Sequence, residues 1–258
     1  MVPWCNTHIE RSVPRVITAS TPHVAAWPPA PLPLPRYRRR RYLLAGEPPT
    51  ESLVGEPLDE AITASGETCL RLAEVPLDDT DAILRFVNDV GTAGFGGDPV
   101  VETVAEFVLG ATIVRDAVAA WRLLTDEPDG EQAHWRLTRL TDVPGAERRA
   151  ASAEYLNDVI ASGLSSITPV LSLSSGPGGR DAILELNLHA LCCLELFNHV
   201  AAANDFPRCA NESCGRLFVR DERARRRGMR YCSRTCARAQ AQREFRRRKA
   251  AAPEPSSG

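Results

Sequence analysis

Long apolar runs are missing from this 258-residue chain. No stretch approaches the eighteen or so apolar residues that a membrane-spanning helix requires. The apolar stretch after the arginine run at residues 36–41 ends after four residues, which is too short for a signal-peptide core. We therefore expect a cytoplasmic protein with no membrane partner, where eight cysteines suit a reducing compartment.

Histidine is scarce, and its positions are informative. The five histidines are scattered, and none lies in a Gly-x-Ser-x-Gly, His-Glu-x-x-His or phosphate-loop motif. Residues 176–179 lack the Lys-Ser or Lys-Thr that a phosphate loop needs, which indicates a turn. No histidine follows His199, and this argues against an HNH-type zinc nuclease, which needs histidine as general base and metal ligand. The sequence predicts no catalytic residues and no enzyme activity.

Four cysteines near the C-terminus form a regular pattern. Four residues separate Cys209 from Cys214, three separate Cys232 from Cys236, and seventeen lie between the pairs. This spacing is typical of a structural tetrathiolate zinc site, because each pair supplies two corners of one tetrahedron. An iron centre is the main competing metal, while disulfides would require an oxidising compartment. We expect one structural Zn²⁺ per chain.

The residues around the cysteines predict a compact module at 206–250. Its expected elements are a polar knuckle, a hairpin of two short strands and a final helix, at residues 209–214, 216–219 with 229–231, and 234–249. Ser233 is the expected helix cap, and Cys232 and Cys236 fall on one face at the helix start. The segment has few apolar residues, so the metal would hold it together. This combination suggests a treble-clef-like module.

Charge is distributed unevenly along the chain. Residues 206–250 hold fifteen basic and four acidic residues, a net charge of +11, whereas residues 51–205 hold nine basic and twenty-six acidic residues, a net charge of −17. A concentration of one sign indicates nucleic acid as the partner, since solvated charge runs normally carry both signs. The residues that we predict to contact double-stranded DNA are Arg216, Arg220, Arg223, Arg225, Arg226, Arg227, Arg230, Arg234, Arg238, Arg248 and Lys249.

Two other functions remain open for the basic module. It could act as a zinc-dependent protein-interaction adaptor that docks on an acidic partner, or on the acidic middle region in an autoinhibited state. RNA binding is the third alternative, and Phe245 is the single aromatic residue on the predicted basic helix face, which offers few stacking platforms for single strands.

Several of these motifs resemble the CGNR zinc finger at the C-terminus of bacterial stress-induced transcription regulators. The resemblance is carried by residues 218–221 (Phe-Val-Arg-Asp), 225–227 (three arginines) and 230–233 (Arg-Tyr-Cys-Ser). Tyr231 replaces the tryptophan of the family, and Cys-Ala-Arg-Ala at 236–239 replaces its Cys-Gly-Asn-Arg. The fourth cysteine is kept, so the resemblance also implies zinc ligation.

The middle of the chain is similar to the ABATE-type domain that precedes this zinc finger. The similar motifs are short, and they are residues 82–88, which end in Asn88, residues 113–117, and Leu156-Asn157. The resemblance implies a mostly helical regulatory domain, a small-molecule or protein effector and DNA-binding transcription regulation. A homodimer is an open alternative.

The expected fold class is mainly α (α+β), with a helical regulatory domain followed by the zinc module. We expect an extended Pro/Arg-rich segment at 1–55, whose lack of packing elements suggests a true start near Val54, and a disordered tail at 251–258. The regulatory domain would span 56–205. Its expected helices lie at 79–90, 102–124, 144–160 and 181–203, and its expected strands at 68–76 and 168–174, with 131–140 either strand or helix.

Overall fold

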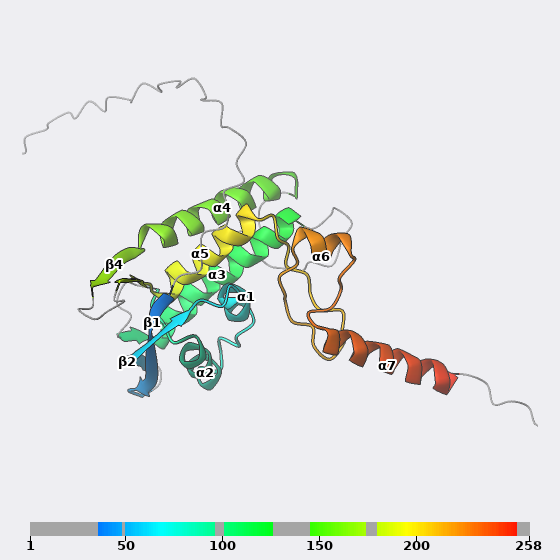
Figure 1. Cartoon of the computed structure of the whole chain (residues 1–258), viewed down its shortest axis with the longest axis horizontal. Helices are drawn as coiled ribbons and strands as arrows, with labels where there is room; N and C mark the ends of the chain where they lie inside the picture. The colour runs from blue at the N-terminus through cyan, green and yellow to red at the C-terminus, as the bar shows by residue number, and fades with distance from the viewer. Residues whose placement is uncertain (1–35, 48–49, 96–100, 126–144, 174–179, 252–258) are drawn as a thin grey trace, which may run out of the picture.

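The first domain is built around a long central helix, α3 (Val104–Thr125), as the computed structural model shows (Figure 1). The structure describes residues 36–47, 50–95, 101–125, 145–173 and 180–251. The short α1 (Thr68–Ala73), α4 (Gly145–Ser165) and α5 (Leu188–Ala201) all pack against α3. The buried face of α3 recurs at helical spacing, with Phe107, Ala111, Val114 and Val118 almost inaccessible. The expected helices at 102–124 and 144–160 are confirmed within the described residues.

A small antiparallel sheet packs beside the helices, in the order β1 (Arg36–Ala45), β2 (Ser52–Thr63) and β3 (Val101–Thr103). The β1–β2 register shifts between Arg38 and Arg40, which marks a bulge. Tyr37 and Tyr42 of β1 are only 3% and 1% exposed and belong to the core. The expectation that residues up to 55 lack packing elements is therefore wrong for the described part of 36–55. The two tyrosines lie among arginines in the sequence, yet their side chains pack in the core. Residues 1–35 and 252–258 lie outside the described residues.

The outer edge of β1 is joined to α2 (Thr80–Val90). The Asn88 side chain accepts a hydrogen bond from the backbone N–H of Tyr42 at 2.8 Å and donates one to its carbonyl at 3.0 Å. Asn88 thus occupies the place of a neighbouring strand. Asp79 caps the start of α2 through Ala82 N–H, and Gly91 ends it with a φ of 75°, so the helix expected at 79–90 is confirmed.

The second sheet is a hairpin of β4 (Thr168–Leu173) and β5 (Arg180–Glu185). The strand expected at 168–174 is confirmed, but the helix expected over 181–203 is wrong in its first part. It begins only at Leu188, where the Asn187 side chain accepts a hydrogen bond from Ala190 N–H at 2.8 Å. Pairing with β4 takes the apolar residues before this cap into a strand.

The strand expected at 68–76 is a helix instead. The alternation of Leu70 and Leu72 favours a strand, yet the start of α1 lies on the carboxylate of Glu195 from α5. That carboxylate is fully buried and accepts hydrogen bonds from Gly66 N–H at 3.0 Å, Thr68 Oγ1 at 2.8 Å and Cys69 N–H at 2.9 Å. A tertiary contact from a distant helix satisfies backbone donors that a short helix leaves free.

Cys69, Cys192 and Cys193 also belong to this core, as does Phe206 from the following segment. Sγ of Cys193 donates to Val159 O of α4, and a Cβ at Gly163 would come within 2.3 Å of this sulfur. The close approach of α4 and α5 therefore needs glycine there.

The segments 131–140 and 176–179 lie outside the described residues. Within the described ranges, no helix is both long and apolar enough to cross a membrane.

Candidate metal centre and basic surface

The C-terminal module begins with two short antiparallel bridges, Asp205–Arg220 and Arg208–Leu217. Residues 216–219 thus lie opposite the segment that precedes the knuckle, and the predicted pairing with 229–231 is wrong. The reversal of the chain at Cys209–Cys214 is the turn of this hairpin, as Cys209 N–H donates to Arg216 O at 2.9 Å. Between the two segments predicted as strands, residues 221–228 contain the one-turn helix α6 (Glu222–Arg226), capped by Asp221.

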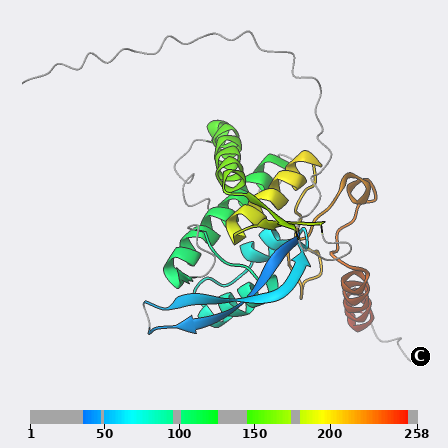
Figure 2. The ribbon, with the colours of Figure 1, turned by 60° about the vertical axis from the view of Figure 1, so that its left-hand side comes forward.

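The final helix, α7 (Arg234–Ala251), confirms the helix predicted at 234–249. Its cap is Ser233, whose Oγ accepts a hydrogen bond from Cys236 N–H at 3.2 Å. Figure 1 shows α7 extending away from the helical core, and Figure 2 shows the same helix nearly end-on, apart from that core. Side chains of its first four turns, from Cys236 to Arg247, contact the rest of the module.

The four predicted cysteines meet at one point. The Sγ atoms of Cys209, Cys214, Cys232 and Cys236 all lie within 4.8 Å of one another. Two of these separations are shorter, 3.8 Å between Cys214 and Cys232 and 3.5 Å between Cys232 and Cys236. Sulfurs at the corners of a tetrahedron with metal–sulfur bonds of ~2.3 Å are separated by ~3.8 Å. The four thiols could therefore coordinate one metal ion with little rearrangement.

The surroundings of the site favour negative charge on sulfur. The Arg216 guanidinium donates a hydrogen bond through Nε to Sγ of Cys232 at 3.2 Å. The pKa of Cys236 is lowered, first by a hydrogen bond with the Asn211 side chain and then by Ser233. Burial acts in the opposite direction on Cys232 and raises its pKa to about 12. Thiolate is the form that binds metal, so the neighbours of Cys236 reduce the cost of deprotonating that one thiol.

One face of α7 holds the knuckle. Arg247 forms two hydrogen bonds with the Glu212 carboxylate, at 2.8 and 2.6 Å, and Arg243 bonds to Asn211 and Ser213. The buried Gln240 accepts from Glu212 N–H. Cys236, Gln240, Arg243 and Arg247 recur at helical spacing, so this face carries both a thiol and the contacts that place the first cysteine pair around it.

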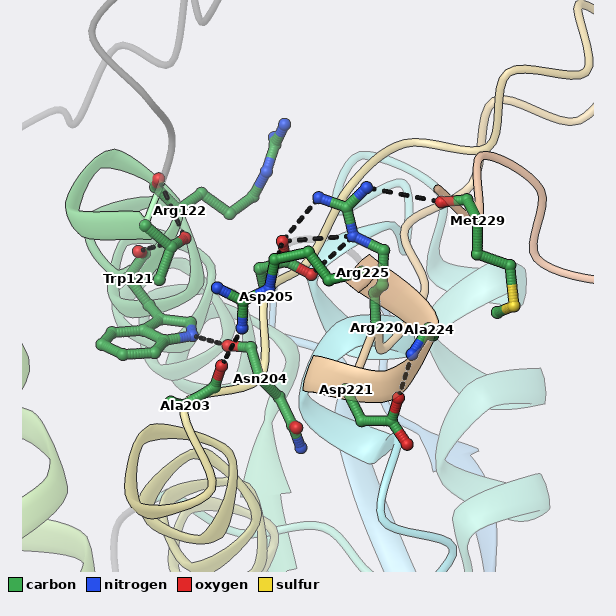
Figure 3. A network of polar contacts seen from close by, with 11 residues as sticks. Trp121, Arg122, Ala203, Asn204, Asp205, Arg220, Asp221, Ala224, Arg225 and Met229 are labelled. Carbon is green, nitrogen blue, oxygen red and sulfur yellow. Dashed lines mark hydrogen bonds and ion pairs between the residues drawn. The ribbon is translucent and has the colours of Figure 1, made fainter. Parts of the chain in front are cut away.

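A polar network joins the module to α5 and α3 (Figure 3). The buried carboxylate of Asp205 accepts hydrogen bonds from Arg220 at 2.9 and 2.6 Å, and Arg225 lies 3.8 Å from the same carboxylate. Arg225 also donates to Ala203 O at 2.6 Å, and Trp121 Nε1 donates to Asn204 O at 2.7 Å. Arg220 and Arg225, both predicted to contact DNA, therefore hold the base of the module in place.

Glu74, just after α1, forms the second connection. Its Oε1 accepts a hydrogen bond from Leu217 N–H at 2.7 Å and lies 3.6 Å from Arg208 Nη1. Leu217 and Phe206 are buried in the core cluster of the first domain. Sequence patterns give no indication of Glu74, because its partners lie more than a hundred residues away.

The predicted DNA contacts divide into two groups. Arg216, Arg220 and Arg225 are engaged by the metal centre or the junction. The others lie exposed on α6, on the loop after it or on α7, and they are Arg223, Arg226, Arg227, Arg230, Arg234, Arg238, Arg248 and Lys249. Arg226 forms an exposed ion pair with Glu222 within α6, which contributes little. The structure therefore leaves a basic surface made of these eight exposed residues.

This arrangement defines a small module whose four cysteines could bind one metal ion, in contact with a mainly helical α+β domain. No family model matches the chain, and no curated protein matches it either.

Proposed function

We propose that the protein is a zinc-dependent, DNA-binding transcription regulator of the CGNR type, acting in the bacterial cytoplasm. One Zn²⁺ bound to the four cysteines would stabilise a treble-clef-like module that presents its exposed arginines to duplex DNA. The helical domain would take a small-molecule or protein effector. The observation that carries the proposal is the position of the four thiols within 4.8 Å beside a surface of exposed arginines.

Zinc is the favoured metal because the donor set is four sulfurs from two close pairs. Four thiolates in a tetrahedron are typical of structural zinc, and such a closed site leaves no position for substrate. The small module also buries few large side chains: Phe206, Leu217 and Phe218 are its main apolar contribution. A metal would supply the stability that this core lacks.

Duplex DNA is favoured because the exposed residues of α6 and α7 are mainly arginines. Guanidinium groups bind phosphate oxygens in a bidentate manner, and their contacts release counterions from DNA. A slope of about −5 in log affinity against log salt is expected if roughly six phosphates are neutralised.

The first experiment measures zinc content by mass spectrometry on the purified full chain, followed by binding of a random-sequence DNA duplex across a salt series. One zinc per chain with salt-dependent binding is the expected result. A slope of log affinity against log salt near zero would contradict DNA binding. A metal-free protein that still binds DNA would contradict the role of zinc.

The adaptor alternative includes an autoinhibited form, and Asp205 and Glu74 are carboxylates of the chain that contact the module. These carboxylates reach Arg208, Arg220 and Arg225, at the base of the module, and within the described residues they leave the α7 arginines exposed. These contacts therefore favour a role in attaching the module to the first domain over a role in covering its basic surface. One zinc per chain without DNA binding would support the adaptor.

A further inference from the structure

The outer face of α7 combines side chains suited to reading DNA bases. Relative to the inward residues Cys236, Gln240, Arg243 and Arg247, the opposite side at 100° per residue carries Arg234, Arg238, Ala241, Gln242, Phe245 and Lys249. All six are exposed, and Phe245 is 61% exposed. Among the described residues, none forms a hydrogen bond or ion pair with the side chain of Arg234, Arg238 or Gln242.

The charge of this face is of one sign. The single acidic residue of α7, Glu244, lies to one side and bonds to Gln240 on the inward edge. Arg243 and Arg247 are occupied by the knuckle, which leaves the outer arginines as the available donors. A positively charged face without carboxylates is complementary to the negative potential of a DNA groove.

The dimensions and position of the helix also fit a groove. Its 18 residues span about 27 Å at 1.5 Å per residue, and it extends away from the first domain (Figure 1). The major groove of B-DNA admits one α-helix, whereas the deep, narrow major groove of an RNA duplex does not.

We propose that α7 is a recognition helix that enters the major groove of duplex DNA, with Arg234 and Arg238 reading guanine. This inference rests on the proposed function and adds sequence readout to it. Arginine bonds in a bidentate manner to guanine O6 and N7, glutamine bonds to adenine, and an apolar side chain contacts the thymine methyl group. Gln242 and Phe245 continue the same stripe, so one helix face offers all three kinds of contact. Arg223 and Arg227 of the α6 region would contact phosphates and set the orientation.

The test begins with selection of a preferred duplex from a random DNA pool by the full-length protein. Each guanine of the selected duplex is then replaced by 7-deazaguanine, which lacks the N7 acceptor but keeps its Watson–Crick pairing. We expect a loss of affinity of about tenfold at one or more guanines, the size typical of one good base contact. An RNA duplex of the same sequence should bind more weakly.

Variants connect that loss to the helix. Arg234→Ala and Arg238→Ala keep helix propensity at exposed positions, and one or both should bind the normal and deaza duplexes equally well. Arg246→Gln is the matched control, because it removes one exposed arginine from the flank of α7. It should lower affinity for both duplexes by the same factor and keep the sensitivity to deazaguanine.

The possible outcomes separate the two proposals. Four results would each overturn the recognition helix but leave nucleic-acid binding standing. The first two are binding with no selected sequence and equal affinity for the normal and deaza duplexes. The other two are sensitivity to deazaguanine that persists in the Arg234→Ala/Arg238→Ala double variant, and equal affinity for the RNA duplex. Absence of binding to every duplex by the zinc-loaded protein would instead overturn the proposed function.

Discussion

Cys236 occupies a position where backbone and side chains both favour a thiolate. It lies in the first turn of α7, where the helix dipole favours negative charge, and the hydrogen bonds with Asn211 and Ser233 lower its pKa. Cys209, by contrast, is buried directly after the Arg208–Leu217 bridge. The four ligands therefore come from one rigid turn and one helix start, and this limits how far they can separate when the site loses its metal.

Replacing Cys236 by serine should reduce bound zinc from one per chain to nearly none. A hydroxyl is a poor substitute for a thiolate as a zinc ligand, and three thiols leave one corner open. Metal analysis after dialysis measures the effect. Thr235→Ala, at the exposed neighbouring residue, is the matched control and should keep its zinc. Full zinc content in Cys236→Ser would contradict the four-cysteine site.

The buried imidazole of His199 should make the stability of the protein depend on pH. Its Nε2 donates to Gly66 O at 2.8 Å, its Nδ1 accepts from Asn204 at 3.2 Å, and its ring packs against Phe206. Burial lowers the pKa of His199, although Gly66 O and the nearby Glu67 act in the opposite direction. The unfolded chain therefore binds the proton more readily, so stability should fall as the pH drops from about 6.5 towards the folded pKa.

Urea denaturation at pH 7.5 and pH 5.5 measures this loss. His199→Gln, which keeps a donor for Gly66 O, should lose less stability than the parent between the two values. The pKa of His189 is lowered by burial as well, so His189→Gln provides the comparison for a second buried imidazole. An identical pH dependence in the parent and His199→Gln would exclude His199 as the responsible group.

Among the elements, β1 depends on a side chain from a helix. Asn88 bonds to both backbone groups of Tyr42, Arg40 N–H donates to Gly91 O at 2.8 Å, and Tyr37 Oη donates to Val90 O at 2.7 Å. These contacts cover an edge that would otherwise present free N–H and C=O groups. The arginine-rich strand is therefore held by the end of α2 and by β2.

Asn88→Ala should destabilise the protein by about 1–3 kcal/mol, since it leaves two partly buried backbone groups of Tyr42 without partners. Chemical denaturation provides the measurement. Asp89→Asn, next in sequence and engaged only in an exposed ion pair with Arg71, should cost less than about 1 kcal/mol. Equal losses in the two variants would show that the contact with β1 contributes nothing specific.

On the scale of the whole molecule, the first domain and the metal-binding module share one core. Phe206 and Leu217 are packed with residues of the helical domain, and Asp205 and Glu74 supply the polar contacts around them. The module therefore contacts the first domain through both apolar and polar groups, and Glu74 links the end of α1 to Leu217. This position makes Glu74 a suitable point from which to test the connection.

Glu74→Ala should accelerate hydrogen exchange at the Leu217 amide, because the carboxylate that accepts its hydrogen bond is removed. Exchange at the Cys209 amide, which bonds to Arg216 O, should change less. Asp78→Ala, at an exposed carboxylate on the same side of the chain, is the control. Unchanged exchange at Leu217 would mean that the module does not depend on Glu74 for its position.

Local pattern was sufficient for several parts of this protein. The spacing of the four cysteines, the helix periodicity of 102–124 and the helix cap at Ser233 can all be read along the chain, and the structure agrees with each. The fold class, mainly α with small sheets, follows from the same short-range signals.

Only the tertiary structure decided the remaining features, because their causes are distant in sequence. Glu195 accepts hydrogen bonds at the start of the helix at 68–73. Asn88 and two buried tyrosines hold the arginine-rich segment as a strand. Asp205 binds Arg220 and Arg225 at the junction. Each depends on a partner from another element, and the resulting burial and hydrogen bonding outweigh local propensity. The sequence determined which residues can bind metal and carry positive charge; the fold determined which arginines remain exposed for a partner.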